Sequence, residues 1–307
     1  MDQFLITFPV SNVQTWVFVP PLVAFVVSFF TSMGGVSGAF LLLPFQVSVL
    51  GYSAPSVSGT NQLFNVLAIP GGVWSYVKEK RMIWPLTWVV VVGTLPGVFL
   101  GAWVRIVYLP DPLHFKFFAG LVLGYIGIRL LSTIIRDWRR KKATSADTQV
   151  TTGTMEIQEV RFSLSRVSFC FNDRLFSFSV PGTVFLCFFV GVIGGIYGIG
   201  GGAIIAPFLI TFFELPVYAV AGAALMGTFV TSVAGVIFYQ VLALYYTHLP
   251  VAPDLLLGSL FGLGGMFGIY CGARCQKYMP ASLIKLILFF CMMFVAVTYV
   301  ASFLTNM

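Results

Sequence analysis

A group of glycines and one proline interrupts an apolar stretch in the second half of the chain: Gly198, Gly200, Gly201, Gly202 and Pro207. A glycine inside a helix costs about 1 kcal/mol relative to Ala and a proline about 3 kcal/mol, so this pattern predicts a helix that stops inside the membrane and restarts. Non-helical backbone at that depth must face protein or a water-filled cavity. The N-terminus of a restarted helix carries free N–H groups and partial positive charge, so the chemistry expected here is anion binding.

The same pattern occurs once earlier in the chain. A shift of 163 residues aligns GGVSGAFLLLPF, residues 34–45, with YGIGGGAIIAPF, residues 197–208. In a register shifted by eight further residues, glycines at four-residue spacing also match, with Gly93, Gly97 and Gly101 on Gly264, Gly268 and Gly272. These matches predict a duplicated half, and paired Gly/Pro breaks point to the binding site of a transporter. The alternative is that the glycines only let helices pack closely.

Polar side chains follow the first break on the next apolar segment, residues 55–76, which is long enough to cross the membrane as one span. Asn61 and Asn65 are four residues apart on one helix face, and they align with Ala224 and Thr228 in the second half. A buried amide without a partner costs about 1–3 kcal/mol, which favours a cavity lined by water or ligand; an interhelical hydrogen bond is the alternative. The residues predicted to bind substrate are Gly34, Gly35, Ser37, Gly38, Thr60, Asn61, Gln62, Asn65, Tyr197, Gly198, Gly200, Gly201, Gly202 and Thr228.

The composition is that of an all-α integral membrane protein. The chain is 58% hydrophobic and 9% charged, whereas about a quarter of the residues in soluble proteins are charged. Of its 17 Lys and Arg, eight lie between Arg136 and Arg174, so the net charge of +7 is typical of cytoplasmic loops and does not imply a nucleic-acid partner. The N-terminus lacks the basic region of a cleaved signal peptide. The five cysteines are an odd number, so no disulfide framework is expected, and packing is the expected role of Cys271 and Cys275.

Two membrane repeats are predicted, residues 1–135 and 182–307, on either side of a cytoplasmic insertion at residues 136–181. Within the insertion, residues 160–180 alternate apolar and polar side chains around Asn172-Asp173, which predicts a β-hairpin. An amphipathic segment on the membrane surface is the alternative.

Topology depends on two short apolar pieces, residues 39–50 and 203–213, each well under the ~20 residues of a perpendicular span. If both cross, each repeat has about five segments, the repeats are inverted, the broken helices meet near the midplane, and both termini face away from the cytoplasm. If both are re-entrant, the repeats are parallel. The positive-inside rule favours inversion, because inversion places Arg274 and Lys277 beside the other basic segments.

Catalysis and metal binding find little support in the sequence. His114 and His248 are the only histidines, no phosphate-binding loop is evident, and no cofactor is expected. Proton-coupled carriers usually keep an acidic residue or a histidine inside the membrane, but Glu214 and Asp254 are expected to be solvated loop charges. A channel would need pore-lining rings from a symmetric assembly, and none is apparent.

The motif GIGGGAIIAPFL at residues 198–209 and the segment GARCQKYMPASLIK at residues 272–285 resemble the sulfite exporter TauE/SafE family of membrane permeases. The resemblance covers residues 29–130 and 191–300; the first-half motif departs from the family pattern at Ser37 and Ala39, where glycines would be expected. The resemblance implies a secondary transporter in the cytoplasmic membrane that exports a sulfur-containing anion such as sulfite or an organosulfonate, for example sulfoacetate. An anion channel, or a permease for another small oxyanion or carboxylate, is the alternative. The expected partners are the lipid bilayer and the small anion, with a homo-oligomer left open.

Overall fold

The computed structural model describes residues 4–34, 36–78, 82–143, 157–163, 165–171, 174–213, 215, 217–275, 278 and 281–306. Most of these residues are helical, and six of the helices are long and apolar enough to cross a membrane. The protein is therefore an all-α integral membrane protein, which confirms the fold class predicted from composition.

The first half opens with a short hairpin that the sequence did not predict. Strands β1 (Leu5–Thr7) and β2 (Gln14–Trp16) pair antiparallel, and Phe8 and Val13 between them are buried. The helices that follow are α1 (Val19–Gly34), α2 (Ala39–Pro44), the π-helix η2 (Phe45–Val49), α3 (Ser56–Ala68), α4 (Pro70–Lys78), α5 (Trp84–Val107) and α6 (Pro112–Ala143).

One predicted span is divided in the structure. Residues 55–76 were expected to form one membrane segment, but α3 ends at Ala68 and α4 begins at Pro70. Proline has no N–H to donate to the preceding turn, so the helical hydrogen-bond ladder is interrupted at this point.

The second half begins after a small sheet of strands β3 (Ile157–Phe162), β4 (Arg166–Phe171) and β5 (Arg174–Ser179). Strands β4 and β5 pair antiparallel with Phe171 opposite Arg174, on either side of residues 172–173, which lie outside the described residues. Strand β3 joins them as a third strand that was not predicted. The helices that follow are α7 (Val180–Tyr197), α8 (Gly202–Phe212), α9 (Val217–Tyr245), α10 (Leu255–Cys275) and α11 (Ala281–Thr305).

The two halves interlock. Helix α5 packs on α7 of the other half, and α10 of the second half packs on α1 of the first, while α3 contacts α9 and α6 contacts α11. At Gly97 and Gly101 of α5, and at Gly264 and Gly268 of α10, an added Cβ would collide with a backbone carbonyl of the facing helix. The glycines at four-residue spacing therefore serve close helix packing, the alternative left open by the sequence.

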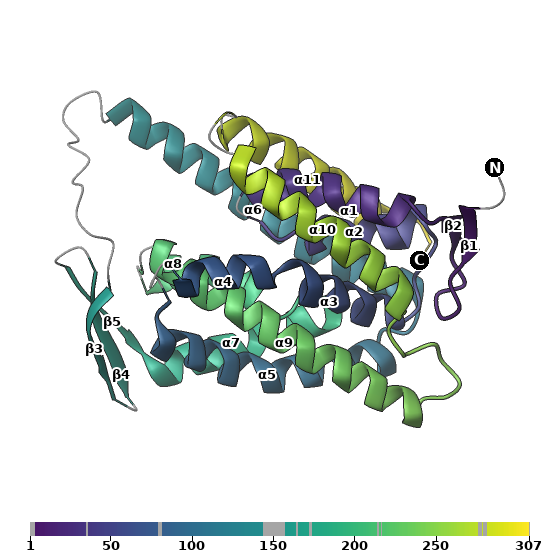
Figure 1. Ribbon diagram of the computed structural model, residues 1–307, viewed down its shortest axis with the longest axis horizontal. Coiled ribbons are helices and arrows are strands. Elements are labelled where there is room, and N and C mark those ends of the chain that lie inside the picture. The colour runs from purple at the N-terminus through teal and green to yellow at the C-terminus, as the bar shows by residue number, and fades with distance from the viewer. Residues whose placement is uncertain are drawn as a thin grey trace.

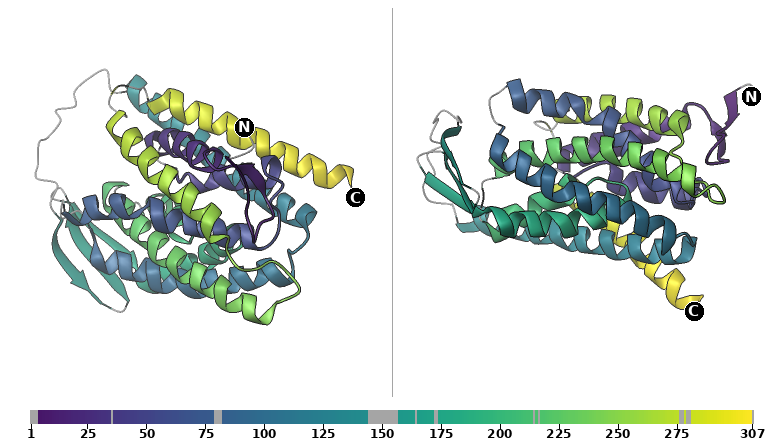
Figure 2. Two further views of the ribbon diagram at one scale, coloured as in Figure 1. Left: turned by 45° about the vertical axis from the view of Figure 1, so that its right-hand side comes forward. Right: turned by 90° about the horizontal axis from the view of Figure 1, so that it is seen from below.

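Corresponding helices run in opposite directions. Helix α1 starts beside the N-terminal hairpin, whereas α7 starts beside the sheet at the other end of the molecule (Figure 1). The right-hand view of Figure 2 shows the N-terminal hairpin and the end of α11 at the side opposite the sheet. Opposite directions are what an inverted pair of repeats requires, and the repeat itself remains a prediction.

We predict that the connection between α10 and α11 faces the cytoplasm, together with the sheet, because the end of α10 and the start of α11 lie at the same end of the helical bundle as the sheet (Figure 1). In a variant without native cysteines, a reporter cysteine at Gln276 should react with an impermeant maleimide only after the cells are permeabilised. A reporter at Asp111, in the loop between α5 and α6, should react in intact cells. Labelling of the Gln276 reporter in intact cells would contradict the inverted arrangement.

Candidate functional site

The second helix break is built from glycines in the left-handed conformation. Gly198 has φ 83° and ends α7, and both its N–H and that of Ile199 donate to the carbonyl of Gly194, at 2.9 and 3.0 Å. Gly200 has φ 73°. A Cβ on Gly198 would also collide with the backbone of Ser58 in α3. Glycine at position 198 is therefore required both by its backbone conformation and by the close approach of another helix.

The first turn of α8 offers unpaired N–H groups. The N–H of Gly201 donates to Thr231 Oγ1 at 3.2 Å. The N–H groups of Gly202 and Ala203 have no hydrogen-bond acceptor among the described residues. The first N–H groups of a helix have no partner within the helix, so these two are free to bind an acceptor from outside it.

The first break is closed by local hydrogen bonds instead. The N–H of Val36 donates to the Thr31 carbonyl at 3.0 Å, and the N–H of Ala39 donates to Ser37 Oγ at 3.3 Å. The start of α2 therefore has fewer free donors than the start of α8. Of the predicted site residues at this break, the structure places Gly34 at the end of α1 and Ser37 and Gly38 before α2, while Gly35 lies outside the described residues.

Two amides on α3 connect the breaks. Asn61 Nδ2 donates to the Ala39 carbonyl at the start of α2 (3.1 Å), and Asn61 Oδ1 accepts from Gln46 Nε2 (3.3 Å). One turn further along α3, Asn65 Nδ2 donates to the Ile199 carbonyl at the second break (3.0 Å). The two breaks therefore lie along one face of α3, and both amides make the interhelical hydrogen bonds that were the alternative to a lined cavity.

Tyr197 makes a direct contact between the breaks. Its hydroxyl donates to the Phe40 carbonyl in α2 at 2.8 Å, and the two aromatic rings lie 6.1 Å apart. Two predicted hydroxyls are used locally: Thr228 Oγ1 donates to the Ala224 carbonyl, and Thr60 Oγ1 donates to the Ser56 carbonyl. Thr60 Oγ1 also accepts a hydrogen bond from the N–H of Asp254 (2.9 Å) and lies 3.0 Å from the Tyr52 hydroxyl, so it joins α3 to the loop before α10.

Several buried polar atoms around residues 61–65 of α3 have no hydrogen-bond partner. They are both side-chain amide atoms of Gln62, Oδ1 of Asn65, Oε1 of Gln46 and Oγ of Ser28. All four side chains are fully buried. An unsatisfied buried polar group costs about 1–3 kcal/mol of folding free energy, so these side chains destabilise the fold unless a ligand or water provides hydrogen-bond partners.

The prediction that Asp254 is a solvated loop charge was wrong. Its side chain is buried, and its carboxylate accepts hydrogen bonds from Ser11 N–H (3.1 Å), Ser11 Oγ (2.8 Å) and Leu257 N–H (3.0 Å). The carboxylate therefore caps α10 and holds the N-terminal hairpin. The sequence offered no signal for this role because the hairpin was not predicted.

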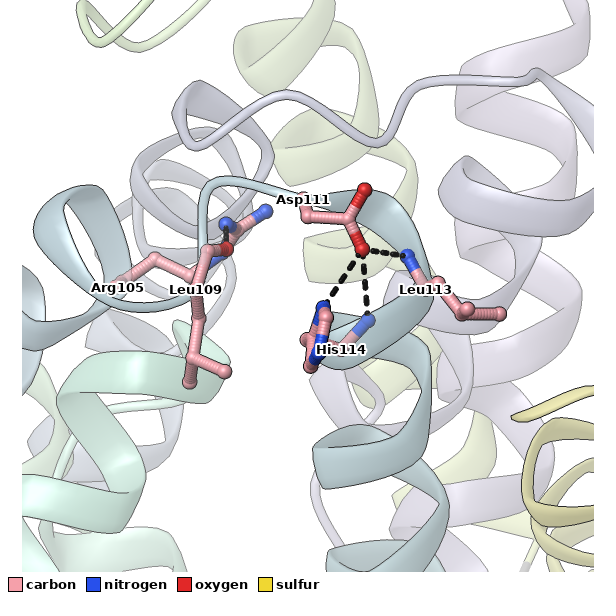
Figure 3. Close-up of polar contacts among 5 residues, drawn as sticks. All are labelled: Arg105, Leu109, Asp111, Leu113 and His114. Carbon is pink, nitrogen blue, oxygen red and sulfur yellow. Dashed lines mark hydrogen bonds and ion pairs between the residues drawn. The ribbon is translucent and has the colours of Figure 1, made fainter. Parts of the chain in front are cut away.

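An exposed acidic residue caps α6 at the same end of the molecule. Asp111 Oδ2 accepts from the N–H groups of Leu113 (3.0 Å) and His114 (3.1 Å), and it lies 2.9 Å from His114 Nδ1 (Figure 3). The pKa of Asp111 lies below its ordinary value, mainly because of the hydrogen bond from the His114 ring. The described residues contain no group of three His, Cys, Asp or Glu that could hold a metal ion.

Comparison with known families gives one match along nearly the whole chain. The family model described as "Sulfite exporter TauE/SafE" matches residues 21–299, which include both helix breaks and all the buried polar residues of α3. No curated protein and no solved structure matches the chain.

Proposed function

The chain belongs to the sulfite exporter TauE/SafE family, a family of membrane transporters, and from this premise we propose that it is a secondary transporter for a small sulfur-containing anion. Sulfite and organosulfonates such as sulfoacetate are the proposed substrates, and export across the cytoplasmic membrane is the proposed direction.

The observation that carries the proposal is the pair of unpartnered N–H groups at the second helix break, those of Gly202 and Ala203 at the start of α8. Gln62 Nε2 on α3 is a further buried donor without a partner, three residues before Asn65, whose amide reaches the same break. Each oxygen of a sulfite or sulfonate group accepts such bonds. The N-terminus of α8 adds about half a positive charge, so an oxyanion here would satisfy donors that are otherwise left unpaired.

Binding without a charged partner suits a carrier that must release its substrate. The predicted substrate-binding residues are all uncharged, so the anion would be held by hydrogen bonds and by helix partial charge. Thr60, Asn61, Gln62 and Asn65 of α3 are each 0% exposed. An anion would therefore reach these residues only after helices around α3 separate, as alternating access requires.

The proposal predicts transport in liposomes that contain only the purified protein. Labelled sulfite should exchange against unlabelled sulfite in a counterflow assay without ATP, because no nucleotide site is evident in the sequence. Sulfate, acetate and methanesulfonate added in competition would define selectivity. A requirement for ATP would contradict secondary transport, and flux without counterflow would indicate a channel.

A further inference from the structure

Arg105 is a fully buried cation in the last turn of α5. Its guanidinium donates to the Leu109 carbonyl in the loop between α5 and α6, and to the Ser53 carbonyl before α3 at 2.8 Å (Figure 3 shows the Leu109 contact). The Phe115 ring centroid lies 3.7 Å from the guanidinium carbon. The side chain thus holds two loops with Nη1 and Nη2, and its Nε has no partner.

No carboxylate among the described residues forms an ion pair with this guanidinium. Asp254, the buried acidic side chain, is engaged by Ser11 and Leu257, and Asp111 is paired with His114. A buried charge without a counter-charge is costly, and an ionisable side chain in a membrane segment commonly marks the path of an ion or substrate. Arg105 therefore has the features of a cation whose counter-ion is supplied from outside the chain.

We propose that Arg105 is a second anion site, at the end of α5 opposite the sheet, that receives the oxyanion before or after it occupies the helix breaks. Two anion oxygens would replace the Ser53 and Leu109 carbonyl oxygens on the guanidinium, in the bidentate geometry that arginine forms with oxyanions. The unpartnered Nε offers a further donor. This inference rests on the proposed transport of an anion.

Hydroxyl groups connect Arg105 with the central residues. Tyr52 precedes Ser53, whose carbonyl accepts a hydrogen bond from Arg105, and Tyr239 is buried in one cluster with Ala102 and Ile106 of α5. The Tyr52 hydroxyl shares a hydrogen bond with Thr60 Oγ1 in α3 (3.0 Å), and the Tyr239 hydroxyl donates to the Gly195 carbonyl in the last turn of α7 (3.3 Å). Tyr52 and Tyr239 therefore link the surroundings of Arg105 to α3 and to the last turn of α7.

The test is the sidedness of sulfite transport in right-side-out and inside-out membrane vesicles. The side that carries the α5–α6 loop is identified by impermeant thiol labelling of an Asp111→Cys variant. Arg105→Gln should raise the KM for sulfite by about tenfold or more when sulfite is offered on that side, because a charge-assisted bidentate contact is lost. The KM measured from the opposite side should change by less than about twofold.

Two further variants control the experiment. Arg105→Lys keeps the positive charge but not the planar guanidinium, so its KM should lie between those of the wild type and Arg105→Gln. If Arg105→Gln does not fold, the KM of Arg105→Lys on the two sides tests the proposal instead. Arg129→Gln removes a cation from α6 whose Nε donates to the exposed Tyr125 hydroxyl at 2.9 Å, and it should leave the KM on both sides unchanged.

An Arg105 variant that alters the KM on neither side, or equally on both, would show that the residue only ties two loops together. That result would overturn the second site and leave the transport proposal intact. A wild-type protein that moves no anion in either vesicle type would overturn both.

Discussion

Gly198→Ala is expected to abolish sulfite transport and to destabilise the fold by about 4 kcal/mol or more, a size that is exceptional for one substitution. Gly198 has φ 83°, and the left-handed conformation alone costs a residue with a Cβ about 1–2 kcal/mol. The larger part arises because the new Cβ would collide with the Ser58 backbone and push α7 away from α3. That movement would also break the bond from Ser58 Oγ to the Ile196 carbonyl.

Gly51→Ala is the matched control. Gly51 has φ 68°, so it carries the same backbone cost, but no atom lies within 4 Å of its added Cβ. This variant should keep most of the transport activity and lose only about 1–2 kcal/mol of stability. Both variants are compared by thermal unfolding in nanodiscs and by sulfite counterflow. Equal behaviour of the two would show that α7 and α3 tolerate separation at this point.

The sequence predicted the helix breaks because their cause is local. Gly198 and Gly200 adopt left-handed backbone, and several glycines close together in an apolar stretch favour a break over a continuous helix. The spacing of Gly97 and Gly101 likewise revealed one helix face, although only the structure shows that the face meets the backbone of α7. The division at Pro70 was missed because the apolar pattern continues across it.

The partners of the polar side chains could not be predicted, because they come from distant parts of the chain. Asn61 reaches α2 and Asn65 reaches the second break, so the breaks are joined through α3. Asp254 is held by Ser11, from a hairpin that the sequence pattern did not indicate. In each case the residue type suggested a polar role, but its location in the fold decided which groups it contacts.

The proposed site takes different polar groups from the two halves of the chain. In the 163-residue register Asn61 corresponds to Ala224 and Gln62 to Leu225. The structure adds that the free N–H groups lie at the other break, at the start of α8. In the proposed site the first half therefore contributes side-chain amides and the second half contributes backbone N–H groups.

Gln62 allows stability to be separated from transport. Both atoms of its amide are buried without a hydrogen-bond partner, and its Oε1 packs against Gly235 of α9. Gln62→Met replaces the amide with an apolar group of similar length, and methionine adapts to irregular space. Removal of an unsatisfied amide should raise the free energy of unfolding by about 1–3 kcal/mol.

The same Gln62→Met variant should transport sulfite about 10- to 100-fold more slowly at low sulfite concentration, because a hydrogen bond to a charged group contributes about 1.5–3 kcal/mol. Leu225→Met, at the corresponding position of the second half, should change neither stability nor transport appreciably. The measurements are thermal unfolding in nanodiscs and initial rates of sulfite counterflow. A stabilised Gln62→Met protein with normal transport would remove Gln62 from the anion site, and a destabilised one would show that its amide is satisfied by water. Opposite changes in stability and rate are expected only if the amide is kept unpaired for a ligand that comes and goes.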